Sequence, residues 1–339
     1  MLITRGFLLS AWLSVQGSAV LLDLAVVDLG PFLDYQSHDD AARAAAAAAL
    51  AEALRHVGMA SLVNHGVDVA ANLAAAQRLF AHPEKRDFAT VEPQRGHIAE
   101  GGESGSRAHE HKEAFAYGYD LERGRAVNNS LQGPNVWPPG DFSALSTGFA
   151  GLSEASRAVV SALSLAREDV AAALAKCCDG DAETISISRL NRYSARPDGG
   201  GDVGSSPHSD WGLLTLIAAS DVDADDGGLQ VWLDGAWVPV RAPRGSLVVN
   251  GGDYLSLASD GLFVSPRHRV VSPARLERYS LVFFWYPDYD SKVPATAAAA
   301  GLSLLECQLD GETCGERADV SFGQFIEDKW KQVSRASDR

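Results

Sequence analysis

The sequence predicts an α+β protein that is mainly β, in which a barrel or jelly roll is supported by an α-rich N-terminal part. The first half of the chain contains helical patterns with identifiable ends. From Thr184 onward, short runs alternate between apolar and polar residues and are separated by turn residues. Many short strands preceded by helices are typical of such a fold. Because 46% of the 339 residues are hydrophobic, a substantial core can form.

Each predicted element is bounded by a recognisable signal. Asp39 and Asp68 precede two helical patterns as N-caps, and a glycine and a proline follow them. Asp234-Gly235 between two alternating runs predicts a hairpin. The stretch Gly96–Arg107 is rich in Gly, Ser and charge, which predicts a surface loop. In chain order we expect a strand over 25–29, a helix over 41–57, a strand over 60–66, helices over 68–80 and 153–178, strands over 229–233, 236–240, 246–250 and 279–286, and a last helix over 320–333.

The chain divides into three parts. In residues 1–22, Arg5 precedes an apolar run and Gly17-Ser18-Ala19 resembles a cleavage site. This extension is either a secretory signal or a disordered segment, and we exclude it from the fold. Residues 23–150 form the α-rich N-terminal region. Residues 151–339 hold the long helix, the β-rich core and the C-terminal helix.

Three residues have the composition of an iron site. His208 and Asp210 are two positions apart, which places both side chains on one face of an extended segment. His268 follows sixty residues later. Two imidazoles and one carboxylate are the ligands of the facial triad that holds Fe(II) and leaves positions open. Taken singly, His208 and Asp210 could be a surface histidine beside a capping aspartate, and His268 could be a hydrogen-bonded core histidine. The occurrence of all three in order within one β-rich region indicates a metal site instead.

A carboxylate anchor follows the second histidine by ten residues. Arg278 and Ser280 share one face of a predicted strand, and a guanidinium beside a hydroxyl suits a carboxylate. Val282 and Phe284 continue that face as an apolar floor. Three upstream residues also alternate onto one face, and they either line the same cavity or are polar residues of an edge strand: Arg189, Asn191 and Tyr193.

A second group of histidines precedes this region. His97, His109 and His111 lie near three glutamates in the sequence. A second metal site is one interpretation. We favour the other, a solvated loop, because such a loop does not hold ligands in place. The glutamates concerned are Glu103, Glu110 and Glu113.

The charge of the chain limits the classes of partner that we expect, and its cysteines indicate the redox state of its compartment. Acidic residues outnumber basic ones 44 to 29, the net charge is −15, and no Lys/Arg-rich run occurs. We therefore expect neither nucleic acid nor a membrane surface as a partner. The cysteines lack a zinc-site spacing, so we expect free thiols in a reducing compartment, with a Cys307–Cys314 disulfide as the alternative. All four are Cys177, Cys178, Cys307 and Cys314.

With these residues in view, the chain resembles the isopenicillin N synthase-like family of Fe(II)/2-oxoglutarate-dependent oxygenases. The resemblance extends from about Leu24 to Trp330. Arg192 departs from it, because many members carry an aromatic residue there, and we expect the nearby substrate contacts to differ. The matching motifs are Val26–Leu29, Gly58-Met59, Val63–Val67, Lys112–Phe115 with Gly118, Asn135–Pro138, Asn191–Tyr193, Gly228–Val231, Val249–Asp253, Ser265–Val270 and Arg278–Ser280.

The resemblance implies a double-stranded β-helix (jelly-roll) core and a role for each motif. It implies that His65 is structural and that Fe(II) is held by His208, Asp210 and His268. It also implies that the distal carboxylate of 2-oxoglutarate is bound by Arg278 and Ser280, with assistance from Tyr193, Asn191 and Arg189.

The expected function is a non-haem Fe(II)- and 2-oxoglutarate-dependent dioxygenase that hydroxylates a small-molecule metabolite with O2 and releases succinate and CO2. The alternatives are a 2-oxo-acid-independent Fe(II) oxidase that cyclises or desaturates its substrate, and a non-catalytic jelly-roll metal-binding protein. No catalytic side chain beyond the metal centre is required. The family is mostly cytosolic, so we expect a cytoplasmic enzyme, or a secretory one if residues 1–19 act as a signal. Besides the 94–107 loop, we expect the substrate pocket to include Phe284, Phe115 and Tyr117.

Overall fold

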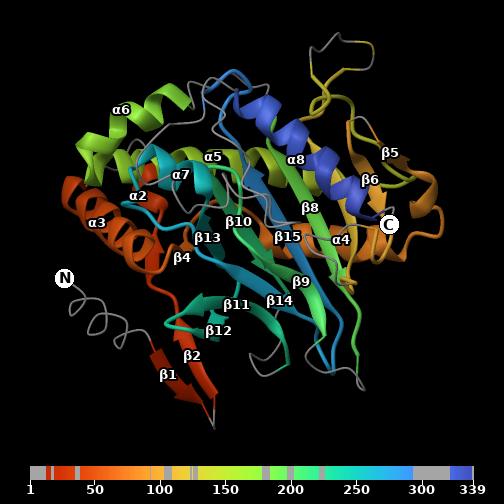
Figure 1. Ribbon diagram of the computed structural model, residues 1–339, viewed down its shortest axis with the longest axis horizontal. Coiled ribbons are helices and arrows are strands. Elements are labelled where there is room, and N and C mark those ends of the chain that lie inside the picture. The colour runs from red at the N-terminus through yellow and green to blue at the C-terminus, as the bar shows by residue number, and fades with distance from the viewer. Residues whose placement is uncertain are drawn as a thin grey trace.

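The protein is described by a computed structural model in which two β-sheets face each other and helices cover the larger one (Figure 1). The sheets are the jelly roll that the sequence predicts. Apolar side chains from both sheets, including Met59, Ile217 and Val231, pack together between them. The structure describes residues 13–16, 19–34, 39–91, 93–102, 109–122, 124, 129–177, 184–196, 202–220, 226–292 and 321–337.

The larger sheet combines strands from both halves of the chain. Its central strand, β15 (Arg278–Trp285), pairs with β10 on one side and with β8 on the other. N-terminal strands extend the sheet at both edges, so the N-terminal region contributes strands as well as helices. In order, the other strands are β3 (Val26–Asp28), β4 (Met59–Val63), β13 (Leu247–Gly251), β10 (Leu214–Ala219), then after β15 β8 (Ile187–Tyr193), β7 (Glu113–Gly118), β6 (Arg95–Ile98) and β5 (Ala89–Thr90).

The smaller sheet contains the predicted hairpin. Asp234 and Gly235 have φ angles of 47° and 86°, and they form the two-residue turn between β11 and β12. At the other side of the sheet, β14 pairs with β9 in an antiparallel ladder. In order, the strands are β1 (Leu13–Gln16), β2 (Ala19–Asp23), β12 (Ala236–Arg241), β11 (Gly228–Leu233), β14 (His268–Val271) and β9 (Val203–His208).

Helices bury the outer face of the larger sheet. The side chain of Asp39 accepts from the amides of Ala41 and Ala42, and that of Asp68 accepts from Ala71, so both predicted N-caps are confirmed. Leu152 and Phe149 pack towards the sheet within the main core. The helices are α2 (Gly30–Leu33), α3 (Asp40–His56), α4 (Val69–Ala81), η1 (Lys85–Asp87), α5 (Ser143–Ala166), α6 (Glu168–Cys177), α7 (Asp253–Ala258) and α8 (Phe322–Ser337). No helix of the described ranges is both long and apolar enough to cross a bilayer.

Three predictions about elements are wrong. The region predicted as one helix over 153–178 contains two helices, because Arg167 leaves the helical conformation and pairs with Asp169. The first of these helices begins at Ser143, ten residues before the predicted start. Part of the predicted loop 96–107 is strand β6, because pairing with β7 satisfies its backbone. Residues 19–22 belong to the fold: β2 pairs with β12, and Leu22 is fully buried. The expected cysteine states lie outside the described side chains.

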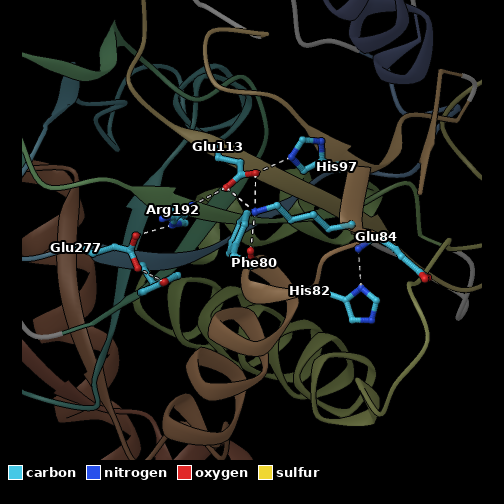
Figure 2. Close-up of polar contacts among 9 residues, drawn as sticks. Phe80, His82, Glu84, His97, Glu113, Arg192 and Glu277 are labelled. Atoms are coloured by element: carbon cyan, nitrogen blue, oxygen red, sulfur yellow. Dashed lines mark hydrogen bonds and ion pairs between the residues drawn. The ribbon is translucent and has the colours of Figure 1, made fainter. Parts of the chain in front are cut away.

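Glu113 occupies the centre of a charge network at the edge of the helical layer (Figure 2). Its carboxylate lies 2.9 Å from Lys85 Nζ, 2.7 Å from His97 Nε2 and 3.1 Å from Arg192 Nη1. Arg192 also pairs with Glu277, so the network joins β7 and β8 to the segment before β15. Burial raises the pKa of Glu113, but the hydrogen bonds from its partners outweigh burial and lower this pKa to about 2.

We expect Glu113→Gln to reduce the free energy of unfolding by roughly 1–3 kcal/mol at neutral pH, because the partners lose a charged acceptor. A carboxyl group with a lowered pKa in the folded state stabilises the protein above its ordinary pKa of 4.5, and this contribution is lost as the pH falls towards 2. Urea unfolding at several pH values should therefore show a steeper decline for the parent protein than for the variant. If the free energy of unfolding fell equally with pH in both proteins, Glu113 would not be the source of the pH dependence.

Candidate active site

A cavity of about 610 Å³, including its opening to solvent, lies between the two sheets. Strands β8, β10 and β15 of the larger sheet form one wall, and strands β9, β11 and β14 of the smaller sheet form the other. The lining residues are Lys112, Arg189, Asn191, Tyr193, Ser205, His208, Asp210, Thr215, Ile217, Leu229, His268, Val270, Arg278, Ser280, Val282 and Phe284. Polar and charged side chains from both sheets converge on apolar walls in this cavity, which is the usual composition of a small-molecule site.

Strand pairing brings two imidazoles together at one end of this cavity. His208 ends β9, His268 begins β14, and the ladder places them directly opposite each other. Their ring centroids are 4.3 Å apart. Asp210 Oδ1 lies 3.6 Å from Nε2 of His208 and 3.8 Å from Nε2 of His268. These three side chains form a group that can hold a metal ion.

The backbone sets the tautomer of both histidines. Nδ1 of His208 lies 2.7 Å from the carbonyl oxygen of Ser206, and Nδ1 of His268 lies 3.1 Å from that of Pro266. Because a carbonyl oxygen can only accept, each Nδ1 must carry the proton. In the neutral form of each ring, Nε2 therefore presents its lone pair to the space beside Asp210, as metal ligation requires.

Asp210 is held as an ionised carboxylate. Its Oδ2 accepts from the side-chain amide of Asn250, a fully buried residue of β13. Burial raises the pKa of Asp210, but the protonated forms of His268 and His208 outweigh burial and hold it below its usual range. Burial lowers the pKa of His208, but the hydrogen bond and charge of Asp210 outweigh burial and raise it. Burial and the neighbouring His208 lower the pKa of His268 to about 4. A neutral imidazole and a charged carboxylate are the states that bind a divalent ion.

A buried guanidinium occupies the other end of the cavity. Arg278 is 5% exposed, and its Cζ lies 5.3 Å from the centre of the Tyr193 ring. Within the described part of the chain, Nη1 of Arg278 has no hydrogen-bond partner. Ser280 is on the same face, and its Oγ accepts from Asn191 Nδ2 at 3.4 Å. This end of the cavity therefore offers unused donors to an anion.

Two further cations face the cavity. Arg189 is opposite Val282 in the β8–β15 ladder, donates to Gln94 and stacks on Trp330 of α8 with its Cζ 4.4 Å from the ring centre. Burial lowers the pKa of Arg189 to about 10, so it remains charged at neutral pH. Lys112 lies 2.8 Å from Glu110, which neutralises it locally.

Two predicted pocket residues are elsewhere. Phe115 and Tyr117 do not line the cavity; both are buried on the opposite face of β7, where they pack against Trp137 under the helices. Arg192 faces the same side, in the network with Glu113, so its departure from the family pattern does not touch the cavity. All the other predicted site residues line it.

Sequence reasoning missed several residues of the site, among them Asn250, Thr215 and Lys112. Asn250 lies within a motif that carried the family resemblance, but nothing in the motif shows that its side chain bonds to Asp210. Thr215 lines the cavity on β10 in an otherwise apolar strand. Lys112 precedes β7, and the bond from the His111 amide to the Val203 carbonyl places its segment along β9. His65 is structural as expected, since its ring bonds to Gly245 and to the Val67 amide.

Comparisons with known proteins agree with this geometry. The profile of the 2OG-Fe(II) oxygenase superfamily matches residues 184–287, and that of the N-terminal domain of non-haem dioxygenases in morphine synthesis matches residues 24–140. Gibberellin 20 oxidase 2 of Oryza sativa is 31% identical over 296 residues, which cover 84% of this chain and 72% of the relative. A homoarginine-6-hydroxylase of Arabidopsis thaliana is 31% identical over 177 residues, covering 49% of this chain and 51% of the relative.

Solved structures share the fold. A full-length Neurospora crassa protein in complex with alpha-KG superposes with a TM-score of 0.70 at 22% identity, covering 94% of this chain and 98% of that one. A putative 2OG-Fe(II) oxygenase family protein from Caulobacter crescentus superposes with a TM-score of 0.68 at 23% identity, covering 91% and 99%. A jelly-roll core with two imidazoles and a carboxylate side by side offers the donor set that a mononuclear non-haem iron oxygenase requires. The chain belongs to the 2OG-Fe(II) oxygenase superfamily, and it is an Fe(II)- and 2-oxoglutarate-dependent dioxygenase.

The two faces of β7 and β15 give a direct test of the corrected pocket. We expect Phe115→Ala to reduce the free energy of unfolding by about 3–5 kcal/mol, because it opens a hole in the core, without changing the affinity for 2-oxoglutarate. Phe284→Ala removes a ring that lines the cavity and should change ligand affinity more than stability. Urea unfolding and calorimetric titration of the cosubstrate measure both effects. If Phe115→Ala changed ligand affinity and Phe284→Ala changed only stability, Phe115 would belong to the pocket after all.

Proposed function

We propose that His208, Asp210 and His268 hold Fe(II), and that Arg278 and Ser280 bind the distal carboxylate of 2-oxoglutarate. The observation that carries this proposal is the unused buried donor of Arg278 in the same cavity as two imidazoles whose Nε2 atoms are free to ligate. Tyr193 and Asn191 support the anchor, since they lie opposite Arg278 and Ser280 in the β8–β15 ladder.

Bound Fe(II) and 2-oxoglutarate supply the activation of O2 that oxidises the substrate, with release of succinate and CO2. The chain's own residues orient the reactants and keep water away from them. Val282, Phe284 and Ile217 form an apolar wall between the imidazoles and the anchor. Arg278 fixes one end of the cosubstrate, and this attachment determines which part of it reaches the imidazoles.

We propose hydroxylation of a small-molecule metabolite as the reaction, and we assign Arg189 to the substrate rather than to 2-oxoglutarate. Arg189 is opposite Val282, one same-face step or roughly 6–7 Å farther along the strand than the Ser280–Asn191 pair. A buried cation in an otherwise apolar wall favours a substrate with an acidic group. Relatives named for the oxidation of gibberellin and the hydroxylation of homoarginine support small metabolites as the substrate class.

The proposed function also bears on where the enzyme acts and on what it binds. We propose a cytoplasmic enzyme, as in most of this family. The formal charge of −15 argues against nucleic acid and against anionic membrane surfaces as partners. The cationic end of the cavity attracts the anionic cosubstrate locally, because Arg278 and Arg189 are buried in the cavity walls, away from the acidic surface.

Iron stoichiometry tests the metal ligands. We expect His208→Ala to lose most bound Fe(II) and at least 100-fold of the O2-dependent release of succinate, because two ligands remain. His65→Ala is the matched control: it removes a histidine that bonds only to backbone, and it should lower stability while keeping the iron content. Metal analysis after anaerobic loading, together with succinate release, measures both variants. Full iron content and turnover in His208→Ala would reject the site.

Variants of the two buried arginines in the cavity test which arginine binds 2-oxoglutarate and which binds the substrate. We expect Arg278→Ala to weaken 2-oxoglutarate binding by about 10–100-fold, because a charge-assisted pair to a buried anion is lost. Arg189→Ala should leave this affinity within about threefold while removing an equal charge from the cavity. Anaerobic calorimetry with Fe(II) and 2-oxoglutarate measures both. Equal losses would return Arg189 to the cosubstrate site, and no loss in Arg278→Ala would refute the anchor.

A further inference from the structure

A second cluster of metal-binding side chains lies outside the cavity. Glu100 Oε1 lies 3.1 Å from Nδ1 of His111 and 3.9 Å from Nε2 of His109, and the three ligand atoms are all within 4.8 Å of one another. The other members of the histidine-rich stretch have different partners, since His97 pairs with Glu113 and Glu110 pairs with Lys112. We propose that Glu100, His109 and His111 form a second divalent-metal site, separate from the iron centre.

The backbone and one glycine hold this cluster in place. The amide of His111 donates to the carbonyl oxygen of Val203, which fixes the segment along β9. Next to His111, Glu110 is buried and accepts from the amide of Ser206. Gly101 has a φ of +70°, and a Cβ at this position would lie 2.2 Å from the ring of His109. The absence of a side chain at Gly101 therefore allows His109 to approach Glu100.

An outer carboxylate faces the second nitrogen of His111. Asp202 Oδ2 lies 3.8 Å from Nε2 of His111 and is itself held by Arg196 at 2.8 Å. Metal-binding histidines commonly direct their other nitrogen towards a carboxylate, which orients the ring and raises its basicity. When Nδ1 of His111 binds the ion, Asp202 supplies this carboxylate. Glu100 therefore remains available as a ligand of the ion.

The donor set favours a borderline ion of the Zn²⁺ type. Two imidazoles and a carboxylate suit Zn²⁺, and a tetrahedral ion about 2.1 Å from each donor would space the donors roughly 3.4 Å apart. The two distances from Glu100, 3.1 and 3.9 Å, are close to this spacing, and all three donors lie within 4.8 Å of one another. The side chains of His109 and Glu100 are 57% and 43% exposed, so an ion can enter from solvent, and water can fill the remaining position.

A bound ion would fix part of the cavity wall. Lys112 lines the cavity and directly follows His111. The ion would tie the turn at Glu100 to the segment 109–112 that lies along β9, and β9 carries His208 at its end. Occupancy of the outer site would thus stabilise the segment that places Lys112 in the cavity.

Zinc stoichiometry tests the second site, with equilibrium dialysis of chelator-stripped protein against Zn²⁺ followed by metal analysis. We expect two Zn²⁺ per chain in the parent protein, one in His109→Ala/His111→Ala, one in His208→Ala/His268→Ala, and none in the combined variant. His82→Ala is the control and should leave two ions, because this histidine belongs to neither cluster and its ring accepts from the amide of Glu84 (Figure 2). In His208→Ala/His268→Ala, added Zn²⁺ should also raise the Tm.

Two further variants keep all the histidines. Gly101→Ala should displace the His109 ring, and Asp202→Asn should remove the outer carboxylate; we expect each to weaken the outer site about tenfold. Two ions in His109→Ala/His111→Ala, or a single parent ion that is lost in His208→Ala/His268→Ala, would overturn the second site. A single parent ion that is lost only in His109→Ala/His111→Ala would instead contradict the inner metal centre.

Discussion

The antiparallel pairing of β9 with β14 is the constraint on which the site depends. It sets His208 opposite His268, although sixty residues separate them in the chain. A slip of one residue in either strand would turn one imidazole away from the cavity. The same backbone also supplies the carbonyl of Ser206 and that of Pro266, which fix both tautomers. The ladder and the adjoining backbone therefore determine the position and the tautomer of both imidazoles.

The larger sheet supplies the second half of the chemistry. Asn250 on β13 holds the carboxylate of Asp210, while β15 carries Arg278 and Ser280 at the far end of the cavity. Facing sheets thus separate the proposed metal-binding end from the proposed anion-binding end, by a distance that the positions of the residues along their strands determine. The overall charge of −15 does not oppose this, because the buried arginines place positive charge directly at the cavity.

Much of the fold and most of the site could be predicted from the sequence, because the relevant strands expose alternate residues to different surroundings. On β15, alternation correctly grouped Arg278, Ser280 and Phe284. It failed on β7, where every residue from Glu113 to Gly118 is buried, so the pattern cannot show which face meets the cavity. The sequence also did not show that Glu100 lies beside His109 and His111, a cluster for which the sequence alone favours a solvated loop.

The most direct test of the account is a crystal structure of the anaerobic complex with Fe(II) and 2-oxoglutarate, measured with anomalous scattering at the iron absorption edge. We predict an iron peak between Nε2 of His208, Nε2 of His268 and Oδ1 of Asp210, with the distal carboxylate of 2-oxoglutarate on the guanidinium of Arg278. Iron bound elsewhere, with these three side chains unligated, would contradict the central claim.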